Sequence, residues 1–335
     1  MRVKRLIYLG YYIKELDWAK FNKFLNYVST RHKKSKMTIL IDILTSVLKY
    51  NIAPIDYFLF RFYEIQDQER GTYAGTGYLY EYQLRMNPIS TRSVLENKLE
   101  FLNHYKSFIK HNHFSLLDIK NDHTLASRIL SNGSGKIVLK NSSGQCGYGV
   151  EVRNCQDFSP ETLIERLKEN KNDLVEEFII QHNKLMQLSS TGLNTIRIIT
   201  QLDTNGDVKI IAARLRISVN SHVDNLAAGN LAAPINLETG KVYGGAVYSD
   251  ITKEQTNTHP LTGVEIIGFE IPYWKETIKM VKDAALMSKG NRSIGWDIAI
   301  TNEGPELLEG NHNWCKLLWQ LPVRRGLKYE LEKYL

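Results

Sequence analysis

Two long segments of alternating apolar residues constrain the fold more than any other feature of this sequence. Residues 194–202 and 208–218 are separated by a short polar segment that contains Asn205–Gly206. An Asn-Gly pair between two alternating segments is a strong indication of a β-hairpin with a tight turn. The hairpin predicts an antiparallel sheet, which excludes a fold built only from parallel strands and crossover helices.

Helices are predicted on both sides of this hairpin, so we expect an α+β fold. Residues 160–170 and 272–289 have helical spacing, and Pro272 stands at or near the first turn of the second helix. Short apolar or β-branched segments predict further strands. These segments are 136–140, 149–153, 174–181, 242–248, 293–301 and 306–309.

A chain of 335 residues is too long for one small core, and its pattern changes along its length. The first part has helical spacing at 39–50 and 56–66, and one more helix is expected over 93–111. We therefore predict three parts. They are a mainly helical N-terminal region at 1–92, a small α+β subdomain at 93–181 and a larger α+β subdomain at 182–335.

A glycine-rich loop follows the predicted strand that ends at Lys140. The loop contains Ser142, Ser143, Gly144, Gly147 and Gly149. Glycines let successive N–H groups turn toward an anion, and Lys140 would add a positive charge for a phosphate. The loop lacks the Gly-Lys-Ser/Thr of a Walker A motif, and a strand follows it where a dinucleotide fingerprint requires a helix. Both a phosphate loop and a hairpin turn without a ligand remain open.

Acidic residues lie on the last two predicted strands. Asp297 alternates with the apolar Ile298 and Ile300, while Glu309 and Asn311 are two residues apart and share a face. If the two strands pair, three oxygen ligands converge, which suits Mg²⁺. The alternative is a salt-bridged pair of acids at the strand ends.

The order of these features resembles the ATP-grasp superfamily, and more closely the sugar-transfer-associated ATP-grasp family. The closer resemblance covers roughly residues 55–325 and rests on several motifs. They are Leu193-Asn-Thr-Ile-Arg197, Asp224-Asn225, Gly229, His259-Pro, Gly268-Phe-Glu-Ile-Pro272-Tyr-Trp and Ser293-Ile-Gly-Trp-Asp297. The resemblance implies two α+β subdomains that sandwich ATP, after a helical region.

The resemblance also implies roles for individual residues. Lys98 and Lys140 match the two nucleotide lysines, and Lys140 would contact the α- and β-phosphates. Ser142, Ser143, Gly144 and Gly147 match the lid over the β- and γ-phosphates. The segment Glu176-Glu177-Phe178-Ile179 matches the hinge that binds adenine and ribose. Asp297, Glu309 and Asn311 match the magnesium ligands.

The sequence departs from many ATP-grasp ligases at Gly295, where those enzymes have an arginine two residues before the metal aspartate. Another cation must then stabilise the developing charge, and Arg197, Arg214 and Arg216 are candidates. We favour Arg197 as the catalytic cation, together with Lys140. The residues predicted to contact substrate are Asn194, Arg214, Arg216, Asp224, Asn225 and Gly229.

The activity implied is that of an ATP- and Mg²⁺-dependent carboxylate–amine ligase that acts through an acyl phosphate. Members of the family are encoded with genes of surface-polysaccharide assembly, so the expected substrate is a small molecule or a glycan precursor. His222 or His259 could take the amine proton, although each is more often structural. A kinase that phosphorylates a sugar-like hydroxyl, or a non-catalytic nucleotide-binding accessory, remains open.

The basic residues are concentrated at the start of the chain. Residues 1–36 carry ten Lys and Arg against two acids, so the remaining residues are close to neutral although the whole chain has a net charge of +7. A basic stripe for nucleic acid would be spread more widely, and we expect no nucleic-acid partner. The segment is either a solvated basic face or a contact with anionic lipid or a glycosyltransferase complex.

Cysteine content and hydropathy bear on localisation. Three cysteines without metal-ligand spacing favour a reducing cytoplasm. No signal peptide is apparent, and residues 37–50 are too short and too polar to span a bilayer. We expect a cytoplasmic protein, with peripheral attachment to the inner face of the membrane as the alternative.

Overall fold

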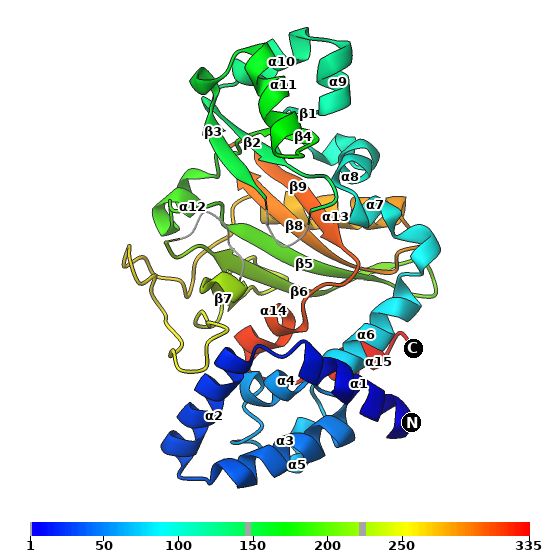
Figure 1. Cartoon of the computed structure of the whole chain (residues 1–335), viewed down its shortest axis with the longest axis vertical. Coiled ribbons are helices and arrows are strands. Elements are labelled where there is room, and N and C mark those ends of the chain that lie inside the picture. The colour runs from blue at the N-terminus through cyan, green and yellow to red at the C-terminus, as the bar shows by residue number, and fades with distance from the viewer. Residues whose placement is uncertain (1, 145–148, 221–225) are drawn as a thin grey trace.

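The computed structural model describes residues 2–144, 149–220 and 226–335. Its elements form a helical N-terminal region, a small four-stranded sheet and a larger five-stranded sheet, with the larger sheet between the other two parts (Figure 1). The α+β class predicted from the sequence is confirmed. No helix in the described ranges is long and apolar enough to cross a membrane.

The N-terminal region contains six helices, and the first four bury side chains in one aromatic core. The six helices are α1 (Arg2–Lys14), α2 (Trp18–His32), α3 (Lys36–Tyr50), α4 (Pro54–Leu59), α5 (Asp67–Arg70) and α6 (Thr76–Met86). The side chains of Asp17 and Ser35 accept hydrogen bonds from the N–H groups of Lys20 and Thr38, so they cap α2 and α3. Phe24, Phe58 and Phe62 are almost fully buried in this core.

The single helix predicted over 93–111 is wrong. The segment contains α7 (Ser93–Glu96), α8 (Lys98–His104) and a 3₁₀ turn at Lys106–Phe108. Asn97 interrupts the helix because its side-chain oxygen accepts hydrogen bonds from the N–H groups of Leu99 (2.9 Å) and Glu100 (3.1 Å). Such an N-cap begins a new helix, and it places Lys98 at the first position of α8.

The small sheet has the order β1–β4–β2–β3, and all its strands are antiparallel. The strands are β1 (His113–Ser115), β2 (Lys136–Lys140), β3 (Glu151–Asn154) and β4 (Leu174–Glu177). Helices α9 (Leu116–Asn121), α10 (Thr124–Leu130) and α11 (Pro160–Glu169) pack on it through buried side chains such as Ile129, Leu139 and Leu163. Strand β4 ends at Glu177, so residues 178–181 are not the continuation of the strand that the sequence predicted.

The large sheet has the order β7–β6–β5–β8–β9. The predicted hairpin is formed by β5 (Thr195–Leu202) and β6 (Val208–Ile217), which pair in antiparallel register. The other strands are β7 (Leu231–Pro234), β8 (Ser293–Thr301) and β9 (Gly304–Asn311). Residues 242–248 form isolated β-bridges at Val242, Ala246 and Val247 in place of the predicted strand.

The two faces of the large sheet differ. Helix α13 (Trp274–Met287) covers one face, where Ile196, Leu215 and Trp296 belong to the main hydrophobic core. Alternation puts a row of charged residues on the opposite face, because Arg214, Arg197, Asp297 and Glu309 are successive cross-strand partners. The row therefore crosses the sheet from β6 to β9.

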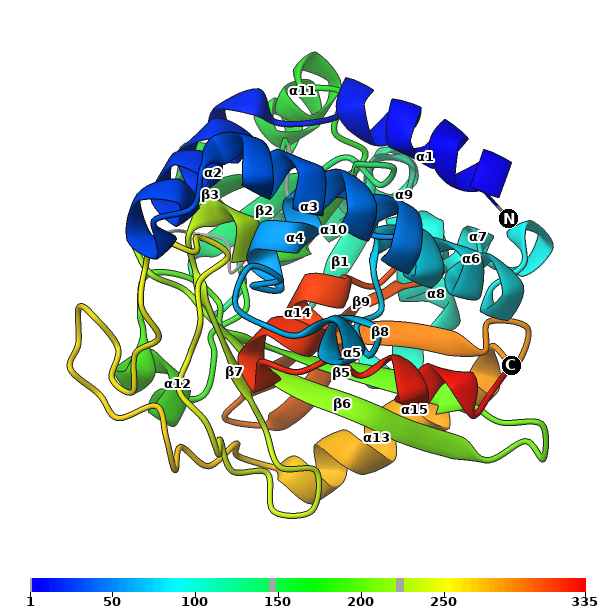
Figure 2. The same cartoon turned by 90° about the horizontal axis from the view of Figure 1, so that it is seen from below.

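The remaining short elements connect these parts. They are α12 (Asn183–Leu188), α14 (Lys316–Gln320), α15 (Lys328–Glu332), and the 3₁₀ turns Ile89–Thr91, Cys155–Asp157, Leu226–Ala228 and Leu321–Val323. Figure 2 shows α14 and α15 lying next to the strands of the large sheet and close to the N-terminal helices.

Candidate active site

The predicted acidic hairpin is formed. Strand β8 pairs with β9 so that Asp297 is directly opposite Glu309. The side-chain Nδ2 of Asn311 donates a hydrogen bond to Glu309 Oε1 at 3.1 Å. Asp297 is buried, whereas Glu309 and Asn311 are half-buried. The hairpin thus brings together the three residues that the sequence predicted as metal ligands.

Two arginines from neighbouring strands bind Asp297. Arg197 donates from Nη2 to Asp297 Oδ2 at 2.7 Å and from Nε to Oδ1, and Arg216 donates from Nη1 to Oδ2 at 2.8 Å. Burial alone would raise the pKa of Asp297, but the charges of the two guanidinium groups outweigh it and hold that pKa well below its usual value. Asp297 is therefore a carboxylate at any physiological pH.

The pKa of Glu309 is shifted upward, in the opposite direction to that of Asp297. Burial and the nearby charge of Asp297 raise the pKa of the Glu309 carboxyl. Two adjacent carboxylates repel each other, and a divalent cation between them would remove that repulsion. Among the residues that the structure describes, no three His, Cys, Asp or Glu side chains converge. Two carboxylates and the Asn311 amide are hard oxygen donors, which fit Mg²⁺ that keeps places for water and phosphate.

Gly295 explains how the arginine reaches Asp297. A Cβ atom at this position would lie 2.5 Å from Cβ of Trp314 and 3.4 Å from Cδ of Arg197. The space that a side chain at residue 295 would need is therefore filled by Trp314 and by the Arg197 stem. The positive charge next to Asp297 comes from Arg197 on the adjacent strand β5, and its catalytic role stays a prediction.

Lys98 lies between the two halves of the site. Its Nζ donates to the carbonyl oxygens of Asn141 (3.3 Å) and Gly144, and its backbone N–H donates to the carbonyl oxygen of Ser142 (3.0 Å). Burial lowers the pKa of Lys98, and the charges of Glu309 and Lys140 also influence it. The contacts of Lys98 thus attach α8 to the loop that follows β2.

The described part of the glycine-rich loop is held by its own polar groups. Ser142 donates from N and from Oγ to the carboxylate of Asp173, both at 2.6 Å. Asn141 accepts at Oδ1 from the N–H of Ser143 (2.9 Å), and its carbonyl accepts from the N–H of Gly144 (3.0 Å). These bonds fix the start of the loop. The predicted lid residue Gly147 lies outside the described residues.

Lys140 forms an ion pair with Glu176 across the small sheet. Glu176 is buried, which would raise its pKa, but the charges of Lys140 and His111 bring that pKa below its usual value. The pair places one charge of each sign at the base of the glycine-rich loop. An incoming phosphate would meet Lys140, and Glu176 keeps that lysine oriented.

The segment after β4 contains both bonded groups and N–H groups without an acceptor in the described backbone. Glu177 Oε2 accepts from Nδ2 of Asn112 at 2.9 Å, and the N–H of Phe178 donates to the carbonyl oxygen of Lys136 at 3.2 Å. The N–H groups of Ile179 and Ile180 donate to no other described backbone group. Backbone groups of this kind are what an adenine ring needs at a hinge.

Two residues predicted near the substrate have structural partners. Asn194 is fully buried and its Nδ2 donates to Gln181 Oε1 (2.9 Å), while its Oδ1 accepts from the N–H of Ser218 (2.9 Å). His259 contacts the carbonyl oxygen of Ser218 through Nε2 at 2.9 Å, and its Nδ1 accepts from the N–H of Thr262 at 3.2 Å. These bonds stabilise the connections between strands.

The other predicted substrate residues lie in or beside a gap in the description. Asp224, Asn225 and His222 lie outside the described residues. Gly229 follows that gap with φ of +89°, a conformation that favours glycine. Their contact with substrate remains a prediction.

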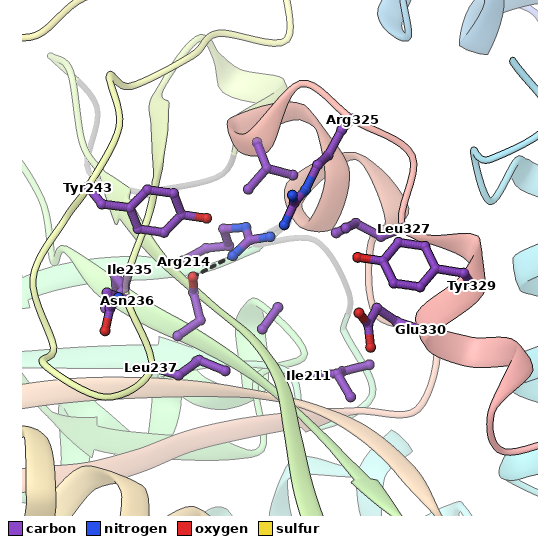
Figure 3. A pocket seen from close by; sticks show the side chains of 13 residues that line it. Ile211, Arg214, Ile235, Asn236, Leu237, Tyr243, Arg325, Leu327, Tyr329 and Glu330 are labelled. Atoms are coloured by element: carbon purple, nitrogen blue, oxygen red, sulfur yellow. Dashed lines mark hydrogen bonds between the residues drawn. The ribbon is translucent and has the colours of Figure 1, made fainter. Parts of the chain in front are cut away.

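Arg214, the third arginine considered, lies apart from Asp297. It is buried and donates from Nε to the carbonyl oxygen of Trp319 at 3.1 Å. Burial, and then the nearby Arg325, lower its pKa to about 10. It lines a cavity of about 260 Å³ with Tyr243 and Arg325, next to the C-terminal segment (Figure 3). The structure thus places Arg197 and Arg216 at the acidic hairpin and Arg214 at this separate cavity.

Sequence reasoning missed one residue that positions the site. Glu306 on β9 is buried, and its Oε2 accepts from the N–H groups of Lys110 (2.9 Å) and His111 (3.1 Å) and contacts His111 Nδ1 at 2.7 Å. This carboxylate ties the metal-site strand to the segment that enters the small sheet. An acid inside an apolar strand was the available indication, but only the fold reveals its partners.

Comparison with known proteins gives one family match. The profile of the sugar-transfer associated ATP-grasp family matches residues 79–334, which is about three quarters of the chain. The match begins in α6, whereas the resemblance in the sequence was placed from about residue 55. No curated protein matches the chain.

Several solved structures are similar at low identity. The ATP-grasp ligase PsnB, complexed with a variant precursor, Mg and ADP, is 13% identical with a TM-score of 0.43, covering 80% of this chain and 67% of PsnB. The D-alanine–D-alanine ligase of Helicobacter pylori is 12% identical with a TM-score of 0.43, covering 74% and 63%. The biotin carboxylase domain of Hydrogenobacter thermophilus 2-oxoglutarate carboxylase, with MgADP, is 14% identical with a TM-score of 0.39. It is matched over 69% of this chain and only 45% of its own.

Proposed function

This chain belongs to the sugar-transfer associated ATP-grasp family, and from that premise we propose that it is an ATP- and Mg²⁺-dependent carboxylate–amine ligase. The observation that supports this most is the position of Lys98, whose side chain bonds to the loop after Lys140 and is acted on by the charge of Glu309, the partner of Asp297. The polyphosphate of ATP needs cations that neutralise its charge and oxygen ligands that hold its metal ion.

Asp297, Glu309 and Asn311 would hold the metal in this proposal. When bound, Mg²⁺ would neutralise charge on the β- and γ-phosphate oxygens of ATP. Arg197 keeps Asp297 ionised and fixes the direction of its carboxylate, because it donates to both oxygens. Oδ2 already accepts from both guanidinium groups, so the lone pair for the metal would come from Oδ1.

The small sheet and the hinge would bind the nucleotide. The N–H groups of Ile179 and Ile180, which donate to no described backbone group, suit the adenine ring, and Glu177 lies next to them for the ribose hydroxyls. Lys140 would exchange part of its contact with Glu176 for a phosphate oxygen, and Lys98 would exchange the loop carbonyl oxygens for another. These exchanges would let the loop at 141–144 close over the phosphates.

The reaction has two steps. A carboxylate oxygen of the substrate attacks the γ-phosphorus and ADP leaves, which gives an acyl phosphate. An amine nitrogen then attacks the acyl carbon, and the carbon–oxygen bond to phosphate breaks as the nitrogen loses a proton. The tetrahedral oxyanion needs fixed donors. Arg197 and Arg216 are the guanidinium groups nearest the hairpin, so we assign this role to them.

The finer identity of the substrates follows the family description. Association with sugar transfer favours an acid or amine that belongs to a glycan precursor, and surface polysaccharide is the product we propose. The protein would act in the cytoplasm, where ATP is available. This assignment rests on family membership and on no contact in the site.

The test is ATP consumption with Mg²⁺ and a panel of uronic acids and amino acids, offered singly and in acid–amine pairs. Products are identified by mass spectrometry. A ligase releases ADP and phosphate only when an acid and an amine are both present, and forms an amide. Asp297→Asn and Glu309→Gln should abolish this turnover, while Glu303→Gln in the exposed β8–β9 turn should not.

Two other outcomes would contradict the proposal. ADP formation with a single hydroxyl compound, no free phosphate and a phosphate ester as product would identify a kinase. Nucleotide binding without turnover of any pair, measured by calorimetry on the same protein, would favour the non-catalytic accessory.

A further inference from the structure

Helix α3 has two apolar faces, and only one of them is buried. Ile39, Ile43 and Val47 belong to the aromatic core of the N-terminal region. Met37, Leu40, Ile41 and Leu44 form a second stripe at helical spacing, and all four are exposed, Ile41 by 60%. Four large apolar side chains in one exposed stripe are unusual for a helix that has solvent as its only neighbour.

Helix α1 carries further exposed apolar residues. Leu6, Ile7, Tyr11 and Ile13 are exposed, with Ile7 at 67%. Arg5 donates hydrogen bonds to the carbonyl oxygens of Leu48 and of Lys49 (2.9 Å), so α1 lies against the C-terminal end of α3. We call the exposed apolar residues of these two helices the α1–α3 apolar surface.

The α1–α3 apolar surface lies in the most basic part of the chain. Lys14, Lys33 and Lys36 are exposed at the ends of the two helices and in the turn before α3. Residues 1–36 contain only two acids against ten Lys and Arg. A surface that combines large apolar side chains with lysines matches the interface of an anionic lipid bilayer, where acyl chains and phosphate groups lie within a few ångströms of each other.

Helix α2 does not contribute in the same way. Phe21, Leu25 and Val28 are buried in the aromatic core of the N-terminal region. The exposed apolar residues therefore lie on α1 and α3, whereas the sequence indicated only the basic segment at 1–36 as a contact with lipid. A second copy of the chain is a poorer occupant, because two strongly basic surfaces would repel each other.

We propose that the α1–α3 apolar surface docks this protein on an anionic lipid bilayer. Figure 1 places these helices at the opposite end of the molecule from α9, α10 and α11, and Figure 2 shows α1 and α3 at the surface of that end. Docking there leaves the small sheet and its helices at the end of the molecule away from the lipid (Figure 1). The proposal does not depend on the reaction that the site catalyses.

The test is flotation of the full chain with vesicles of phosphatidylcholine alone or with phosphatidylglycerol added. The wild type should bind the anionic vesicles, and binding should weaken as salt is raised to about 0.5 M. Ile41→Glu combined with Leu44→Glu should lower the partition coefficient at least about tenfold. Leu261→Glu, at an equally exposed residue (60%) far along the chain, is the matched control and should bind like the wild type.

Circular dichroism and ATP turnover should be unchanged in the double variant, because both substituted side chains are exposed. Undiminished binding of anionic vesicles by Ile41→Glu/Leu44→Glu would overturn the proposal. So would sedimentation that shows a wild-type dimer, dissociated by the same substitutions, together with no vesicle binding. That result would make the surface an interface between two copies of the chain.

Discussion

Removing Arg197 should expose how much the site depends on a cation supplied from β5. In Arg197→Gln the buried Asp297 loses both bonds from Arg197 and keeps the bond from Arg216. Breaking one partner of a buried ion pair costs about 3–5 kcal/mol, and the remaining Arg216 places this case near the lower value. We expect a loss of about 3 kcal/mol in the free energy of unfolding.

A double-mutant cycle with Asp297→Asn isolates the pair. The double variant should be more stable than the sum of the two single effects predicts, with a coupling energy of about 2 kcal/mol in chemical unfolding. Arg214→Gln is the control, because Arg214 is buried on the same face but bonds to Trp319 and is two strands from Asp297. Its coupling with Asp297→Asn should stay below about 0.5 kcal/mol.

The same variants test catalysis separately from stability. If Arg197 also stabilises the oxyanion, Arg197→Gln should lower kcat about 10²–10³-fold at a temperature where it is fully folded. A coupling energy near zero would refute the geometry, since it would mean that the guanidinium and Asp297 do not interact. Normal kcat in a folded Arg197→Gln variant would refute the catalytic role while leaving the ion pair intact.

Three further changes test other parts of the site. Gly295→Ala places a Cβ 2.5 Å from Trp314 Cβ and should destabilise the fold by about 1–3 kcal/mol in thermal unfolding, unlike Gly133→Ala, which meets no atom within 4 Å. Asn97→Ala removes the cap of α8, should cost about 1 kcal/mol and should raise the KM for ATP by misplacing Lys98, whereas Asn97→Asp should retain the cap. Although burial alone would raise the pKa of Glu306, its bonds with His111 and two backbone N–H groups lower it. Its stabilisation is therefore complete above the ordinary glutamate pKa and is lost as pH falls through the lowered one; Glu306→Gln should remove this acid sensitivity and about 2 kcal/mol of stability.

The sequence predicted the large sheet well because its strands are long and their alternation is regular. The β5–β6 hairpin and the β8–β9 hairpin both pair as expected, and the second pairing brings Asp297 and Glu309 together. Register follows from burial of one face, since a shift by one residue would bury the acids in the main core. The proximity of Asp297, Glu309 and Asn311 was predictable for the same reason.

The short elements were not predictable from periodicity. Strand β1 has three residues and β7 has four, which is too few for alternation to be distinguished from loop sequence. The break at Asn97 is decided by one side chain that bonds to two N–H groups, although the flanking sequence has continuous helical spacing. Long-range ties such as Glu306 to His111 depend on the packing of segments that are almost 200 residues apart.

Gly295 and Arg197 together place a cation beside the carboxylate of Asp297. A side chain at residue 295 would collide with Trp314 and crowd the Arg197 stem. Arginines at position 295 on β8 and position 197 on β5 would therefore exclude each other. Arg197 and Arg216 both bond to Asp297, and their two positive charges balance the charges of Asp297 and an ionised Glu309. A divalent cation would leave this cluster with excess positive charge unless polyphosphate came with it. Metal and nucleotide should therefore bind together, because each compensates the charge that the other brings to the hairpin.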